Sequence, residues 1–188
     1  AIAAAGGIEL VLDAMQRFEK STDVQRWGCI ALRALSSPIT QARIGEYDGI
    51  ATIVAAMRAH PWDADVLQWA CFALSDIAAG SAANQACVRA CEGQAAVVAA
   101  LNAHPADVNV QRWGCYALGV FAANNPENSE RVGECGGVEA ILAALERYPN
   151  NEDVLGGGLY ALAVLALRND RNKARIGAGV RHIISGLI

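Results

Sequence analysis

The sequence predicts an all-α protein built as a solenoid of stacked helical repeats. Two observations support this fold class: hydrophobic residues make up 54% of the chain but aromatic residues only 6%, and one helical pattern occurs four times along it. Ala and Gly supply much of the apolar content, which suits closely packed helices better than a sheet with β-branched or aromatic faces. A period of about 40 residues is typical of proteins whose repeats stack side by side.

The clearest repeated block is a long helical pattern that starts at residues 23, 65, 109 and 153, and so at intervals of 42, 44 and 44 residues. Its copies are DVQRWGCIALRAL, DVLQWACFALSDI, NVQRWGCYALGVF and DVLGGGLYALAVL. In the first copy the apolar stripe of a helix with one buried face is formed by Val24, Gly28, Ala31, Leu32 and Leu35. One unit cannot bury this stripe alone, so neighbouring copies are expected to stack and close a continuous core.

Two further blocks precede the long helix. The second block has the form GGIELVLDAMQRF and begins at Gly6, Asp48, Glu92, Gly136 and, in part, Ala178. A shorter block comes before it, as in NSERVGECGG from residue 128 and NKARIGAGV from residue 172. We therefore expect each unit to contain a short helix, a glycine break, a helix that ends at Pro or a polar loop, and a longer third helix.

These blocks resemble the armadillo family, whose repeats of about 40 residues have three helices with a Gly-Gly break after the first. The resemblance covers the whole chain and implies a right-handed superhelical solenoid. The implied units are a repeat lacking most of its first helix at 1–37, complete repeats at 38–80, 81–123 and 124–167, and a partial repeat at 168–188. Ala1 to Ala5 align with the last turn of a first helix and Ile188 with the inside of a second helix, so we expect further repeats or domains on both sides.

The resemblance also implies a concave groove lined by third helices, where some family members hold an extended peptide with a Trp and an Asn four residues later. The Trp-equivalent positions hold Ile30, Phe72, Tyr116 and Tyr160, and the Asn-equivalent positions hold Ala34, Asp76, Val120 and Val164. Because the bidentate amides are absent, a nuclear-localisation-signal receptor of the importin-α kind is disfavoured. An aromatic groove remains.

A polar residue lies one turn before three of these aromatic-row positions. Such a donor could bind a carboxylate or stack on a partner side chain, although a merely solvated helix face is the slightly favoured interpretation. Asp76 could bind a partner Lys or Arg, or pair with Arg112 or Arg33. The candidate partner-binding residues are therefore Arg26, Ile30, Gln68, Phe72, Asp76, Arg112, Tyr116 and Tyr160.

Tryptophans lie at the edge of the buried stripe in three copies, at Trp27, Trp69 and Trp113. Packing between repeats is the favoured interpretation, with an aromatic anchor for a partner as the alternative. Trp62 follows a proline in a loop and is expected to pack at the rim.

Three of the six cysteines, Cys29, Cys71 and Cys115, occupy the same place in successive copies. Stacked helices are about 10 Å apart, beyond the roughly 7 Å limit between the Cα atoms of a disulfide, so these residues are expected to be buried thiols in a reducing, cytoplasmic compartment, including cytoskeletal or ciliary structures. Cys87 and Cys91 could supply half a zinc site, but no further ligand pair lies near in sequence, so no metal or cofactor is expected.

No residues suggest catalysis. His60 and His104 recur at equivalent helix ends and are interpreted as repeat architecture. The glycine run 156–158 follows no strand, which excludes a phosphate loop and favours a weakened helix or a close contact. Because no nucleophile, base and orienting group stand outside the repeat pattern, we expect the chain not to be an enzyme.

Charge and hydropathy narrow the partner class. The net charge of −4 and the isoelectric point near 5.3 disfavour nucleic acid. The longest uncharged stretches, 113–126 and 154–167, cover 14 residues each, short of the roughly 18 to 20 that span a bilayer. We expect a protein-interaction module or scaffold that binds another protein or peptide segment. The alternatives are a passive structural part of a cytoskeletal or ciliary assembly and, less favoured, the non-catalytic frame of an enzyme complex.

Overall fold

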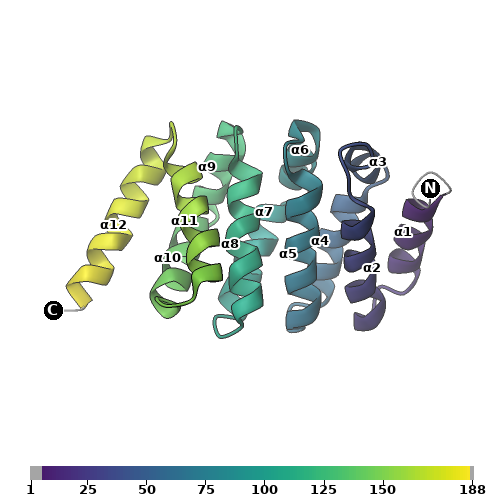
Figure 1. The fold of residues 1–188 in the computed structure, drawn as a ribbon, viewed down its shortest axis with the longest axis horizontal. Coiled ribbons are helices and arrows are strands. Elements are labelled where there is room, and N and C mark those ends of the chain that lie inside the picture. Colours follow the sequence, from purple (N-terminus) through teal and green to yellow (C-terminus); the bar gives the residue numbers. More distant parts are fainter. Residues whose placement is uncertain (1–5, 187–188) are drawn as a thin grey trace.

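The structure is a computed structural model that describes the backbone of residues 6–186 and the side chains up to residue 181. Across this part of the chain the regular elements are all α-helices, and they form one elongated stack from α1 to α12 (Figure 1). The prediction of an all-α fold is confirmed. The expectations for Ala1 to Ala5 and for Ile188 concern residues outside the described range.

The longest repeated pattern forms four helices that lie side by side: α2 (Thr22–Leu35), α5 (Ala64–Ala78), α8 (Val108–Ala122) and α11 (Glu152–Ala166). They are in front in Figure 1, and each contacts the next along the stack. We call these the third helices, and the surface that they form the third-helix face.

The second block forms α1 (Gly7–Arg17), which lies beside α2 at the end of the stack, and α4 (Gly49–Ala59), α7 (Gly93–Ala103) and α10 (Gly137–Arg147), which lie further back (Figure 1). The short block forms α3 (Gln41–Glu46), α6 (Ala82–Ala90) and α9 (Pro126–Glu134), and the chain continues into α12 (Asp170–Gly186). Helix α12 packs against α9, α10 and α11.

Each third helix begins at a side-chain cap. The oxygens of Ser21, Asp63, Asp107 and Asn151 accept a hydrogen bond from the backbone N–H three residues later, at 3.4, 2.9, 2.9 and 3.1 Å respectively. A cap of this kind satisfies one of the free N–H groups in the first turn of a helix. The same chemistry therefore fixes the start of the third helix in all four copies.

At the glycine break, two neighbouring residues have different roles. The left-handed residue is the one before the helix, including the non-glycines Asp48 at φ 60° and Glu92 at φ 59°. The glycine that follows is needed for space, because a Cβ on Gly49 would lie 2.7 Å from the carbonyl oxygen of Ile44, and one on Gly93 would lie 3.1 Å from that of Val88. The break is a close approach of two helices.

The break expected at Ala178 is wrong, since α12 runs without interruption from Asp170 to Gly186. Ala178 stands where the other copies adopt the left-handed conformation, which costs an alanine about 1–2 kcal/mol. Gly179 lets this helix pass close to α10, because a Cβ there would lie 2.3 Å from Cδ1 of Leu142. In the described residues the short block and the start of the second block therefore form one continuous helix.

The core is continuous through the stack. The leucines of the predicted stripe, Leu32, Leu74 and Leu118, are each 0% exposed, and so are Cys29, Cys71 and Cys115. These assignments from the repeat pattern are confirmed.

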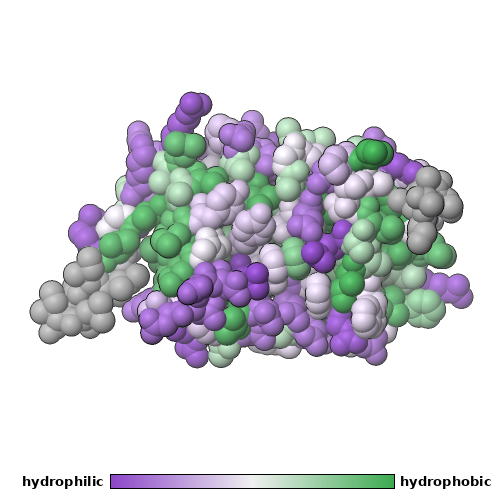
Figure 2. All heavy atoms as spheres, in the orientation of Figure 1, coloured by the Kyte–Doolittle hydropathy of each residue, from purple (hydrophilic) through white to green (hydrophobic). Residues whose placement is uncertain are grey.

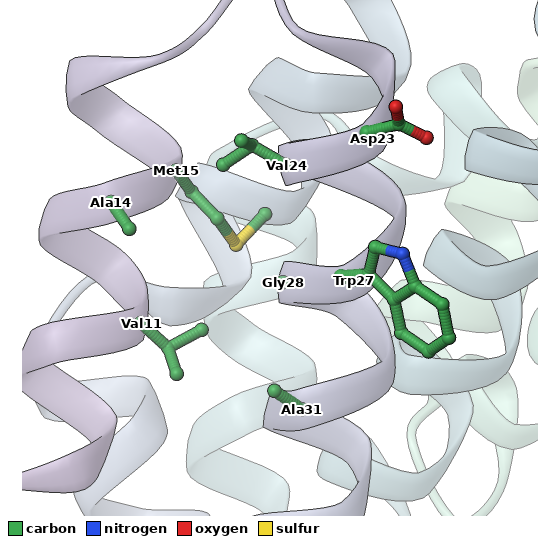
Figure 3. Close-up of a pocket in the computed structure, with 8 residues that line it drawn as sticks. All are labelled: Val11, Ala14, Met15, Asp23, Val24, Trp27, Gly28 and Ala31. Carbon is green, nitrogen blue, oxygen red and sulfur yellow. The ribbon is translucent and has the colours of Figure 1, made fainter.

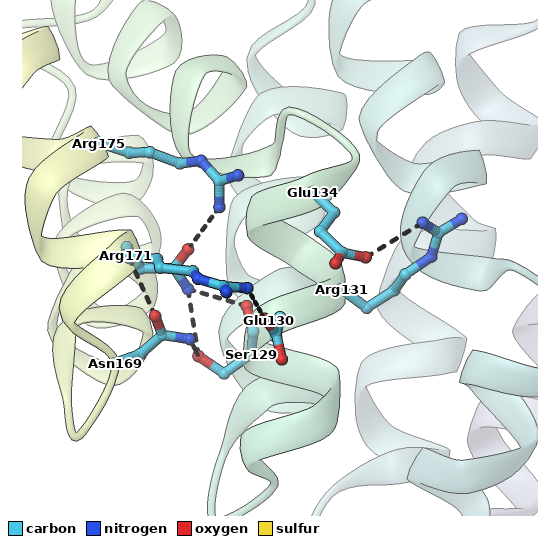
Figure 4. A network of polar contacts seen from close by, with 8 residues as sticks. Ser129, Glu130, Arg131, Glu134, Asn169, Arg171 and Arg175 are labelled. Atoms are coloured by element: carbon cyan, nitrogen blue, oxygen red, sulfur yellow. Dashed lines mark hydrogen bonds and ion pairs between the residues drawn. The ribbon is translucent and has the colours of Figure 1, made fainter.

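Buried asparagines join the short helices in a way that the sequence analysis did not anticipate. The Nδ2 of Asn128 donates to the carbonyl oxygens of Gln85 and Phe121, both at 2.9 Å, and the Nδ2 of Asn84 donates to those of Gln41 and Ile77 at 2.9 and 2.8 Å. Asn172 repeats the contact by donating to Ser129 O at 2.8 Å. Figure 4 shows the last of these junctions, with the ion pair between Arg171 and Glu130 beside it and the pair between Arg131 and Glu134 on the other side of α9.

Candidate partner-binding surface

A row of five aromatic side chains crosses the third-helix face from α5 to α11. Successive ring centroids are 6.1 Å apart for Trp69 and Phe72, 3.4 Å for Phe72 and Trp113, 6.2 Å for Trp113 and Tyr116, and 5.4 Å for Tyr116 and Tyr160. The predicted aromatic positions thus join a single row in three consecutive third helices. Trp69 and Trp113 belong to it because each lies three residues before the next aromatic position, on the same side of its helix.

Phe72, predicted to contact a partner, is packed between two side chains of its own chain. Its ring stacks on Trp113, while the Cζ of Arg33 lies 3.6 Å from its centroid. Two groups this close to one centroid cannot share a face of the ring, so both faces are covered by the chain itself. Only the edge of Phe72 is available to a partner, and the ring is first of all a joint between α2, α5 and α8.

Tyr116 and Tyr160 leave more of the row accessible. Tyr160 is 37% exposed and Tyr116 is half-buried. Burial, and to a smaller extent the neighbouring Tyr116, raises the pKa of the Tyr160 hydroxyl, so this group is a neutral hydrogen-bond donor at neutral pH. Together these two residues offer an apolar surface with polar edges, of the kind that is common at protein interfaces.

The predicted polar row is occupied by partners from the same chain. Arg26 Nη1 lies 3.6 Å from Asp65 Oδ2, and Arg112 Nη1 lies 3.0 Å from Asp153 Oδ2, so each arginine reaches the start of the next third helix. Gln68 Nε2 donates to Asp65 Oδ1 at 2.6 Å. Ion pairs this exposed contribute about 0–1 kcal/mol each and can exchange for a partner's carboxylate.

Asp76 pairs with Arg33, one of the two arginines suggested by the sequence, at 3.0 Å between Oδ2 and Nε. Burial raises the pKa of its carboxyl, and the charge of Arg33 opposes that rise. Ile30, the first member of the predicted row, is half-buried on α2 and belongs to none of the aromatic pairs. Asp76 and Ile30 are therefore weaker candidates for partner contact than the tyrosines.

Trp27 differs from its two counterparts. Trp69 and Trp113 pack against the core, as the packing interpretation expected, whereas Trp27 is 60% exposed. It borders an apolar cavity of about 330 Å³ between α1 and α2, lined also by Val11, Met15, Val24 and Ala31 (Figure 3). The described chain has no third helix before α2, so packing between repeats stays a prediction for Trp27.

Hydrophobic side chains gather at both ends of the third-helix face, over α1 and α2 and over α11 and α12 (Figure 2). Pale and hydrophilic side chains cover α5 and α8 between them. The exposed apolar residues at the two ends include Leu10, Phe18, Trp27, Leu159 and Leu167. Exposed apolar areas of this kind commonly mark interaction surfaces.

The recurring histidines serve the architecture, as predicted. His60 Nε2 lies 2.7 Å from the carbonyl oxygen of Glu19, and His104 Nε2 lies 2.9 Å from that of Pro61. Each ring thus links a second helix to the loop of the preceding unit. Trp62 is 79% exposed, and its ring centroid lies 6.5 Å from that of His104, which places it at the rim.

The described residues hold no group of three or more His, Cys, Asp or Glu side chains placed to bind a metal ion. Among the helices of that range, none is both long enough and apolar enough to cross a membrane.

The repeat geometry agrees with a comparison against protein families. The family model described as LRRK2 ARM repeat matches residues 6–174. The chain belongs to the LRRK2 ARM repeat family. The armadillo assignment made from the residues is confirmed, and armadillo repeat domains generally mediate protein–protein interaction and are typically non-catalytic. No curated protein and no solved structure matches the chain.

Proposed function

We propose that this armadillo domain is a protein-interaction module or scaffold that binds a segment of a partner protein along the third-helix face. In this proposal the face is the concave groove of a right-handed superhelix of three-helix repeats. The observation that carries the proposal is the aromatic row from Trp69 to Tyr160, which continues across three consecutive third helices and stays partly accessible at Tyr116 and Tyr160.

The chemistry of the row supports a protein partner. Tyrosine and tryptophan are enriched among the residues that dominate binding energy at interfaces, because they bury a large area and keep a hydrogen-bonding edge. The ion pairs beside the row, such as Arg112 with Asp153, supply polar groups that can change partner. Buried free thiols in the same helices suit a reducing compartment such as the cytoplasm.

The test is a binding series on two faces. A photo-crosslinking residue at position 160 should recover a partner from native extract, and the recovered protein should then be titrated in purified form. Tyr116→Ala and Tyr160→Ala should each weaken its binding by about 1–3 kcal/mol, the range of aromatic hot spots. Glu146→Ala on α10 is a suitable control, because Glu146 is exposed and lies on a second helix.

The proposal would be overturned if Glu146→Ala weakened binding while Tyr116→Ala and Tyr160→Ala left it unchanged. It would favour the second candidate, a structural component of a larger assembly that uses other surfaces. The specific observation for that candidate is the apolar cavity at α1 and α2 together with the exposed Trp27 (Figure 3). Trp27→Ala would then be the variant that loses binding.

A further inference from the structure

The junction between α8 and α11 differs from the other third-helix junctions because α11 lacks two large side chains. Where the other third helices have Arg or Gln followed by Trp, α11 has Gly156 and Gly157. Gly157 is buried, and a Cβ there would lie 3.0 Å from the carbonyl oxygen of Arg112, so α11 approaches the backbone of α8 directly. Gly156 faces open space, since no atom lies within 4 Å of its Cβ position.

The missing side chains leave a hollow of about 290 Å³, which we call the α8–α11 notch. Three rings border it: Trp113 and Tyr116, whose planes are 77° apart, and Tyr160, tilted 35° to Tyr116. Rings at such different angles present both edges and faces to one space. The notch is at the small end of the range for ligand pockets, and so it suits one side chain better than a whole cofactor.

The charges at the rim are acidic in sum. Glu152 and Asp153 lie in the first turn of α11, and Arg112 lies opposite with Nη1 at 3.0 Å from Asp153 Oδ2. Asp153 is therefore neutralised within the chain. Glu152 is exposed and forms no ion pair with any described residue, which leaves one uncompensated negative charge beside the three rings.

The chain itself supplies a precedent for a cation in these surroundings. The Cζ of Arg112 lies 4.5 Å from the centroid of Trp113, within the distance of a cation–π contact. Long cationic side chains lay an apolar stem along such surfaces and keep the charged head in water. Tyr116 and Tyr160 offer the surface for a stem, and Glu152 offers the counter-charge for a head.

We infer that the α8–α11 notch receives one lysine or arginine side chain of the partner segment, with its stem against Tyr116 and Tyr160 and its charged group beside Glu152. This inference rests on the proposed function and adds the chemistry of the partner. An acidic partner residue fits less well, because it would have to displace Asp153 from Arg112 and because the net charge of the rim is negative.

The notch can be tested without the natural partner. The probes are capped tripeptides with Arg, Lys, norleucine or Glu between two alanines, titrated into the isotopically labelled chain. The indole N–H of Trp113 and the amides of Gly156 and Gly157 report binding by NMR. The Arg and Lys peptides should bind about three- to fivefold more tightly than the norleucine peptide, as an added cation–π contact and counter-charge predict, and Glu152→Gln should remove this preference.

A second test fills the notch with a side chain of the protein itself. Gly156→Gln inserts the residue that α5 carries at the same position, Gln68, and it favours the helix because glycine is a poor helix former. It should weaken the binding of the Arg and Lys peptides at least about tenfold, a loss of the size expected when an interface hot spot is removed. Ala163→Gln is the control, since Ala163 is exposed on the same helix, and it should leave peptide binding unchanged.

Two results would overturn the inference: norleucine or Glu peptides that bind as tightly as the cationic ones, or Gly156→Gln and Ala163→Gln variants that behave alike. In either case the proposed function stands if the tyrosine variants still weaken the crosslinked partner. A cation-selective notch combined with a partner that ignores Tyr116→Ala and Tyr160→Ala would instead overturn the proposed function alone.

Discussion

Phe72 on α5 and Trp113 on α8 stack with their ring centroids 3.4 Å apart and their planes 11° apart. Residues that the sequence assigns to two separate repeats thus form one contact. The same ring of Phe72 is covered on its other face by Arg33 from α2. The central part of the third-helix face therefore holds three repeats together, and a partner that binds there would also stabilise the stack.

Replacing Phe72 should consequently affect stability before it affects binding. We expect Phe72→Ala to lower the free energy of unfolding by about 2–4 kcal/mol, slightly less than a fully buried phenylalanine, because its ring is half-buried. In a stack of repeats the loss can appear as local opening, so hydrogen exchange in α5 and α8 is the suitable measurement.

Trp62→Ala provides the comparison for Phe72→Ala, because Trp62 is an aromatic residue that is 79% exposed in a loop. It should change exchange in α5 and α8 little. If both variants leave amide protection in these helices unchanged, the stacked joint contributes nothing to the coupling of the repeats.

The repeat pattern made most of the fold predictable, because each property that it encodes is local and recurs. The cap at Ser21 and the buried Leu32 belong to patterns that several copies share. The partners of the polar side chains could not be predicted in the same way. Whether Arg112 faces a ligand or Asp153 depends on the angle between neighbouring helices, which no single repeat encodes.

Two other features of the structure have a counterpart in the sequence. Asn84, Asn128 and Asn172 recur at intervals of 44 residues, and such a recurrence of a polar residue inside an apolar pattern indicates a buried structural hydrogen bond. The loss of Arg and Trp at Gly156 and Gly157 breaks the same pattern, and the notch lies at that break. Departures from the repeat were more informative about a site than the repeat itself.

The three equivalent cysteines should be almost unreactive in the folded protein. Burial raises the pKa of the Cys29 and Cys115 thiols to about 12 and also raises that of Cys71, so hardly any thiolate forms at pH 8. Labelling with a maleimide at this pH, read by mass spectrometry, should modify Cys29, Cys71 and Cys115 only after denaturant is added. Rapid modification of all three without denaturant would contradict their buried positions.

The same pKa differences predict a dependence of stability on alkaline pH. Below about pH 9, the ordinary pKa of a thiol, Cys29 and Cys115 are protonated in both states and their contribution to stability is complete. As the pH rises from about 9 towards 12, the unfolded thiols ionise while the folded ones stay neutral, and the free energy of unfolding falls. Urea unfolding at pH 7.5 and 10.5 should show this fall, and a variant with Cys29→Ala and Cys115→Ala should show a smaller one.

Leu118→Ala should cost about 2–5 kcal/mol of stability, because Leu118 is 0% exposed in the centre of the stack. Leu32→Ala and Leu74→Ala should behave similarly, since both residues are equally buried. The loss is expected as reduced hydrogen-exchange protection around the altered helix. Leu159→Ala is the matched control on a third helix, because Leu159 is 58% exposed; equal effects from Leu118→Ala and Leu159→Ala would show that the assigned helix register is wrong.

Replacing Gln94 should stabilise the protein, in contrast to the leucine variants. Its side chain is 0% exposed at the start of α7, and neither its Nε2 nor its Oε1 has a hydrogen-bond partner in the described structure. The equivalent positions hold the buried apolar residues Ile8, Ile50 and Val138. A buried amide without partners costs about 1–3 kcal/mol, so Gln94→Leu should raise the free energy of unfolding by about that amount.

The same change at Gln111 should do the reverse. Gln111 is also buried, but its Nε2 donates to the carbonyl oxygens of Leu101 at 2.8 Å and His104 at 3.0 Å, at the end of α7. Gln111→Leu would leave both carbonyls without this donor and should lower stability by about 1–3 kcal/mol. Both variants replace Gln by Leu, so the change in side-chain volume is the same in each. A difference between their free energies of unfolding in urea therefore reports the difference in hydrogen bonding. A loss of stability in Gln94→Leu as large as that in Gln111→Leu would mean that the Gln94 amide is satisfied after all, by an internal water or by an alternative side-chain conformation.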